Sequence, residues 1–147
     1  MLRRQAFTLV EMMIAIAVIG VLAAIAIPIF EQTRMQAKRA ELPAMMSGIL
    51  VAAAGYEMAN DERIQVLALQ PDETPSKAQR PWVRGTGFDT IGWAPDGEVR
   101  GSYMMEYNEE LHYVAYGACD VDSDGNWSWW LADDRAGIRM MTETTAY

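Results

Sequence analysis

The stretch MMIAIAVIGVLAAIAIPIF, residues 12–30, decides how this 147-residue chain is organised. It holds 19 consecutive residues without a charged or strongly polar side chain. A helix needs about 20 apolar residues to cross the hydrocarbon core of a bilayer. Residues 7–10 extend the stretch to that length, and Glu11 alone interrupts it. The sequence therefore predicts a membrane-spanning helix over residues 7–30.

The charges around this stretch predict its orientation. Arg3 and Arg4 precede it, and the first ten residues include no acid. Because basic residues stay on the cytoplasmic side, we expect the N-terminus inside and residues 31–147 outside. A secretory signal peptide is the alternative, but its cleavage site requires small residues after the apolar core. Residues 25–30 read IAIPIF and are followed by basic residues, which makes a poor site.

Glu11 is the unusual residue of the predicted helix. A carboxylate in an apolar helix costs on the order of 2.5–3.5 kcal/mol at the bilayer centre and less near its edge. Such a residue usually has a partner, and we expect none within the apolar segment itself. We therefore expect the partner of Glu11 to come from elsewhere, which argues against a plain signal anchor.

The stretch RRQAFTLVEMMIAIAVIGVLAAIAIPIF resembles the N-terminus of type IV prepilins and of the related type II secretion pseudopilins. Their shared pattern is a short basic leader, a small residue, Phe-Thr-Leu-Val-Glu and an apolar helix. The resemblance implies that a prepilin peptidase removes residues 1–6 by cutting between Ala6 and Phe7, and methylates the new amine of Phe7. The family usually has glycine before the cut, where this chain has Ala6.

The resemblance also implies which residues act in assembly. Glu11 would attract the N-terminal amine of a neighbouring subunit, and Thr8, Gly20 and Pro28 match family positions. Glycine and proline each weaken a helix. Two outcomes stay open: the segment between Gly20 and Pro28 loses its helical form in the filament, or the helix has a simple kink at Pro28.

Residues 31–60 change to an amphipathic helical pattern with a bend at Pro43. One apolar stripe, expected to pack on a sheet, recurs at helical spacing. Its members are Met35, Leu42, Met45, Ile49, Ala52, Tyr56 and Ala59. A loop follows at residues 70–81, which hold three prolines and no apolar periodicity.

The C-terminal half has the patterns of β-strands. Residues 98–107 alternate between apolar and polar side chains, residues 111–119 are apolar on both faces, and residues 127–132 follow a turn. Residues 138–144 are a candidate fourth strand. The prediction is an α+β fold, in which a long N-terminal helix packs on a three- or four-stranded antiparallel sheet. This is also the pilin architecture.

An acidic turn stands between the second and third predicted strands. Asp120, Asp122 and Asp124 precede Gly125 and match the start of a calcium loop. The twelfth position, where such a loop has glutamate, is Leu131. The alternatives are a calcium site, as some pilins and pseudopilins have, and a plain hairpin turn that Asp-Gly favours unaided.

The composition excludes other functions. The chain has 12 basic and 20 acidic residues and a net charge of −8, which argues against nucleic-acid binding. Cys119 and His112 are the single residues of their kinds, and no nucleophile–base pair is discernible, so we expect no enzyme. We interpret His112 as structural, Cys119 as a buried thiol, and the tryptophans around Trp129 as core and subunit contacts.

The function that these features favour is that of a structural subunit of a type IV pilus. The precursor would span the inner membrane once, with a cytoplasmic N-terminus. After prepilin peptidase has acted, the inner-membrane assembly machinery would build it into an extracellular helical homo-oligomer. The alternatives are a type II secretion pseudopilin and a minor or tip pilin that acts as a binding module.

Overall fold

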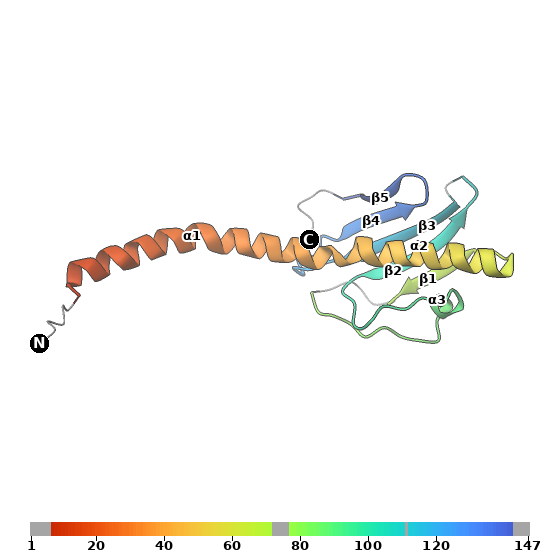
Figure 1. Cartoon of the computed structure of the whole chain (residues 1–147), viewed down its shortest axis with the longest axis horizontal. Coiled ribbons are helices and arrows are strands. Elements are labelled where there is room, and N and C mark those ends of the chain that lie inside the picture. Colours follow the sequence, from red (N-terminus) through yellow and green to blue (C-terminus); the bar gives the residue numbers. More distant parts are fainter. Residues whose placement is uncertain (1–6, 72–76, 111, 143–147) are drawn as a thin grey trace, which may run out of the picture. The chain divides into compact units, whose positions relative to one another are not determined.

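The computed structural model describes residues 7–71, 77–110 and 112–142 (Figure 1). The chain divides into two compact units, Met1–Arg34 and Met35–Tyr147. The predictions for Arg3, Arg4 and Ala6 lie outside the described residues. Helix α1 spans Leu9–Arg39, and it runs through Gly20 and Pro28 without interruption.

Helix α1 has the surface of a membrane segment. None of its residues is buried, and its large apolar side chains up to Phe30 are between 53% and 75% exposed. With the helix that follows, it makes one helical span, Leu9–Asn60, whose length and apolar composition are enough to cross a membrane. The predicted long apolar helix is therefore confirmed.

Helix α2, Glu41–Asn60, begins after a one-residue break at Ala40. Pro43 explains the break, because proline has no N–H to donate and its ring crowds the carbonyl four residues earlier, that of Arg39. The helix ends at Asp61, which adopts a left-handed conformation with φ 52° and donates its N–H to the Glu57 carbonyl.

The buried face of α2 is only partly the predicted stripe. Leu42 and Ile49 are fully buried, as expected, but so are Met46 and Ala53. Ala59 was predicted to share this face and is exposed. The helix period of 3.6 residues rotates the contact line away from a strict seven-residue repeat, which explains the difference.

The sheet has five antiparallel strands rather than three or four. In chain order, which is also their spatial order, they are β1 Val66–Gln70, β2 Ser102–Asn108, β3 His112–Cys119, β4 Ser128–Asp133 and β5 Gly137–Met140. Sequence reasoning missed β1, which is short and bulged. Strand β2 starts later than predicted because Val99 instead forms an isolated bridge with Arg80.

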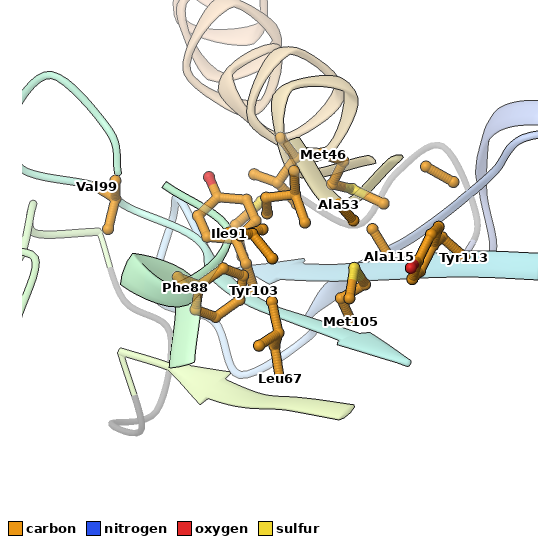
Figure 2. Close-up of a cluster of buried hydrophobic side chains, with 14 of the residues drawn as sticks. Met46, Ala53, Leu67, Phe88, Ile91, Val99, Tyr103, Met105, Tyr113 and Ala115 are labelled. Carbon is orange, nitrogen blue, oxygen red and sulfur yellow. The ribbon is translucent and has the colours of Figure 1, made fainter. Parts of the chain in front are cut away.

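One face of the sheet carries α2 (Figure 1). Figure 2 shows Met46 and Ala53 pointing from α2 toward Met105 and Ala115 of the sheet. Gly117 makes this approach possible, since a Cβ atom there would lie 2.8 Å from Met46 Sδ. The α2–sheet contact therefore needs glycine in β3.

A cluster of four aromatic side chains covers one side of the core. Trp82, Phe88 of the short helix α3 (Gly87–Thr90), Trp93 and Tyr103 have ring centroids 5.3–6.5 Å apart. Gly48 gives Trp93 its place, because a Cβ there would be 2.7 Å from the indole nitrogen.

Glu41 fixes the start of α2 to the sheet. Its Oε1 accepts hydrogen bonds from Arg100 N at 2.9 Å, Gly101 N at 3.4 Å and the Tyr103 hydroxyl at 2.9 Å. The Arg100 guanidinium lies 3.7 Å from its Oε2. Charge-assisted hydrogen bonds of this kind contribute more than neutral ones.

Replacing the glycine under α2 should separate the two layers. We expect Gly117→Val to lower the free energy of unfolding by about 1–3 kcal/mol, because the new methyl groups overpack Met46 and Leu42. The matched control is Gly55→Ala on the exposed face of α2, where a Cβ meets nothing within 4 Å. That change should stabilise the helix by up to about 1 kcal/mol. Equal effects of the two variants on thermal unfolding would contradict the packing argument.

The buried Asp133 carboxylate should make the fold acid-sensitive. The Ala136 N–H, followed by the Arg139 guanidinium and the Arg135 N–H, holds the pKa of Asp133 below its usual range. A lowered folded-state pKa gives stability that is present above the unfolded value near 3.8 and lost as pH falls through the folded value. We therefore expect Asp133→Asn to flatten the dependence of the melting temperature on pH below about pH 4. An unchanged slope would contradict this role.

Candidate functional site

The first candidate site is the start of α1. Thr8 precedes the helix, and its N–H and hydroxyl both donate to Glu11 Oε2, at 2.8 Å and 2.7 Å. The Thr8 hydroxyl in turn accepts the Glu11 N–H at 3.2 Å. This reciprocal pattern is a capping box, which satisfies donors that a helix N-terminus leaves without partners.

The capping box corrects one expectation. We expected the apolar segment to offer Glu11 no partner, and Thr8, one turn before it, is a partner. The sequence signal was Thr-x-x-Glu in front of an apolar run, a recognised sign of a helix start. Both donations reach Oε2, and Oε1 receives no hydrogen bond from any described residue. Among the described residues, therefore, only one of the two carboxylate oxygens has hydrogen-bond donors.

The other predicted assembly residues have simpler surroundings. Phe7 lies directly before the box and is 78% exposed. A Cβ atom on Gly20 would meet nothing within 4 Å, so no contact of the described chain requires this glycine. Pro28 lies inside α1. Their predicted roles in assembly stay predictions.

The second candidate site is the acidic turn after β3. Carboxylate oxygens of Asp120, Asp122 and Asp124 all lie within 4.8 Å of one another. Asp120 is buried and accepts hydrogen bonds from Ser123 N at 2.6 Å and Gly125 N at 3.2 Å. Burial and the neighbouring carboxylates raise the pKa of Asp122.

These residues do not fit a complete calcium loop. Calcium takes six to eight oxygen ligands. Both oxygens of Asp120 accept backbone hydrogen bonds, and both oxygens of Asp124 accept hydrogen bonds from Asn126. Leu131, at the twelfth position, is a buried residue of β4. Strands β3 and β4 pair on either side of the turn, so it is a hairpin turn, and the calcium site stays a prediction.

Comparison with known proteins bears on the first site. The model of a family described as the prokaryotic N-terminal methylation motif matches residues 1–27. The chain is 31% identical over 100 residues to the type IV major pilin protein PilA of Myxococcus xanthus (strain DK1622). The alignment covers 68% of this chain and 43% of that protein, so the chain spans less than half the length of this relative. These two matches support the type IV pilin family for this chain. No solved structure matches it significantly.

This similarity agrees with the fold and with the predicted class of protein. The long apolar helix and the antiparallel sheet make a pilin-like α+β fold. Type IV pilins are structural proteins rather than enzymes. The apolar helix and the methylation motif fit a membrane-anchored precursor of a pilus protein.

The remaining residues that the sequence singled out have structural surroundings in this chain. Cys119 is fully buried, and burial raises its pKa to about 12, so it stays a thiol at neutral pH. His112 Nδ1 lies 2.8 Å from Asp134 Oδ2. Trp130 packs partly against the core, and Trp129 on the other sheet face is 40% exposed.

The acidic turn should be stable without calcium. We expect Asp120→Asn to lower the free energy of unfolding by about 1–3 kcal/mol, because an amide replaces a charged acceptor of two backbone hydrogen bonds. The loss should be equal in EGTA and in millimolar calcium. A calcium-dependent rise in the melting temperature that Asp122→Asn abolishes would instead establish the calcium site.

Proposed function

We propose that this chain is a structural subunit of a type IV pilus. Prepilin peptidase cuts between Ala6 and Phe7 and methylates the new amine. The assembly machinery then moves the helix from the inner membrane into the filament. Two features of α1 together support the proposal. The helix is apolar and has no buried residue, and the carboxylate of Glu11 at its start accepts hydrogen bonds on only one oxygen from the described residues.

Glu11 gives the assembly its register. With Oε2 held by Thr8, Oε1 faces no donor among the described residues and is available to the amine of Phe7 from a neighbouring subunit. An ammonium group beside a carboxylate in a low-dielectric seam is strongly attracted. Leaving either charge alone in that seam is costly, which favours one helix position over its alternatives.

Apolar burial supplies most of the stabilisation. The side chains of α1 that are exposed in the single chain would pack between the helices of neighbouring subunits. Removing apolar surface from water contributes roughly 25 cal/mol per Å². Lipid already covers part of this surface in the membrane, so the net gain on assembly is smaller.

Removing the Glu11 charge should stop assembly without releasing the protein from the membrane. We expect Glu11→Gln, as the only subunit in the cell, to be processed and membrane-bound but to lower filament yield by about tenfold or more, the effect of losing a charge-assisted contact. The control is Glu31→Gln, an exposed acid of the same helix. Normal filaments from the Glu11 variant would refute the pairing role.

Thr8 should matter through its hydroxyl. Thr8→Val keeps the shape of the side chain and removes the hydroxyl contacts with Glu11 Oε2 and N. We expect this variant to lower filament yield, whereas Thr8→Ser should retain it because serine caps a helix equally well. The measurement is quantitative recovery of sheared filaments. Similar yields from both variants would show that the box is dispensable.

Two related functions share the N-terminal features. A type II secretion pseudopilin would build a short periplasmic piston, and a minor or tip pilin would act as a binding module. Imaging surface filaments, with N-terminal mass spectrometry of their main subunit, separates these options. Long filaments composed mainly of this chain, beginning with methylated Phe7, would support the major pilin.

A further inference from the structure

A cavity of about 250 Å³ lies at one end of the second unit, apart from both sites above. It opens where the last turns of α2 meet the β2–β3 hairpin and Asp134. Two carboxylates line it, those of Glu57 and Asp134, and so does the phenol of Tyr113. These are three oxygen-bearing groups in one hollow.

Each of the two carboxylates has one oxygen in contact with a nitrogen-bearing side chain of the described residues. Arg63 Nε lies 2.5 Å from Glu57 Oε1, and its guanidinium stands 4.9 Å from the centre of the Tyr107 ring. His112 Nδ1 lies 2.8 Å from Asp134 Oδ2. The hydrogen bond from Arg63, followed by the contact with the Tyr113 hydroxyl, holds the pKa of Glu57 below its usual range. The second oxygen of Asp134 receives no hydrogen bond from the described residues.

The imidazole of His112 lies between Asp134 and Arg135. Arg135 Nη2 is 3.3 Å from His112 Nε2, and arginine can only donate, so Nε2 accepts in this contact. Nδ1 then donates its proton to Asp134.

Tyr113 adds a buried hydroxyl that lies beside the Glu57 carboxylate and the Ile64 backbone. The residue is 5% exposed, and its buried hydroxyl makes no hydrogen bond of normal geometry with described residues. Burial, together with the nearby Glu57 carboxylate, raises its pKa to about 12. The phenol thus stays neutral, and its oxygen can accept one more donor.

The surroundings of the cavity are negative. The end of the unit formed by α2, the hairpin turn and the β4–β5 turn carries six acids against two bases, a sum of −4. The acids are Glu57, Asp61, Glu62, Glu109, Glu110 and Asp134, and the bases are Arg63 and Arg135. The C-terminus of α2 adds the negative end of its helix dipole.

Part of the cavity wall is apolar and can contact the carbon atoms of a ligand. Ala54 and Met58 line it, and Met58 is 88% exposed. Apolar walls around a small set of acceptors suit a ligand with a charged head and an aliphatic or sugar body. The volume is enough for one such group.

We propose that this cavity binds a protonated primary amine, whose three N–H donors match Glu57, Asp134 and Tyr113. Lysine side chains and amino sugars both present this chemistry. The proposal concerns the second unit and is independent of filament assembly.

Matched pairs of small probes test the proposal on the full chain in detergent micelles. NMR shifts of the Tyr113 and His112 rings follow the binding. The amine probes are glucosamine and Nα-acetyl-lysinamide, and their uncharged controls are N-acetylglucosamine and Nα-acetyl-norleucinamide. We expect saturable shifts from the amine probes only. If one amine binds and the other does not, the proposal stands and the source of the amine is identified.

Variants separate the cavity from general surface charge. Glu57→Gln and Asp134→Asn should each weaken amine binding by about tenfold, the effect of one charge-assisted hydrogen bond. Glu109→Gln changes the net charge equally outside the cavity and should have little effect. Ala54→Leu fills the cavity without changing charge and should abolish binding. Equal binding of the uncharged probes, or an equal loss with Glu109→Gln, would overturn the proposal.

Discussion

The close approach of α2 to strand β3 is the constraint on which the second unit depends. Met46 and Leu42 of α2 lie directly over Gly117, where a Cβ atom would be 2.8 Å from Met46 Sδ and 3.3 Å from the Leu42 side chain. A helix and a sheet that bury their apolar faces against each other must interdigitate at the density of a crystal, so one missing methyl group sets their separation. The distance between α2 and the sheet therefore depends on Gly117 in β3.

Glu41 adds the second constraint, which is position along the helix axis. Its carboxylate accepts donors from Arg100, Gly101 and Tyr103. Burial and the Glu41 charge raise the pKa of Tyr103, so its hydroxyl stays protonated and donates. A one-residue shift of α2 would break these contacts and also move Met46 away from Gly117. Packing and polar contacts thus specify the same register, which is typical of a uniquely folded core.

The features that depend on local pattern could be predicted from the sequence. The apolar run, the amphipathic change after residue 30 and the alternation in β2 each have a period or a length that a single sequence displays. Strand β1 could not be predicted, because five residues with a bulge show no clear alternation. The contacts of Glu41 could not be predicted either, since nothing in its helical position reveals that the loop before β2 folds back onto it. The cavity beside Tyr113 depends on three segments far apart in sequence, and no local pattern indicates it.

The contact between Thr8 and Glu11 changes the energetic argument about the membrane helix. A bare carboxylate in an apolar helix would need an external cation simply to be tolerated. Held at the first turn, Glu11 has the positive end of the helix dipole and two Thr8 donors on one oxygen, which stabilise its charge within the chain. The precursor therefore does not depend on a neighbour for its own stability in the membrane. In the proposed filament, the amine of a neighbouring subunit would add a donor for the remaining oxygen of Glu11. Its contribution would be to the choice of register rather than to the stability of the single subunit.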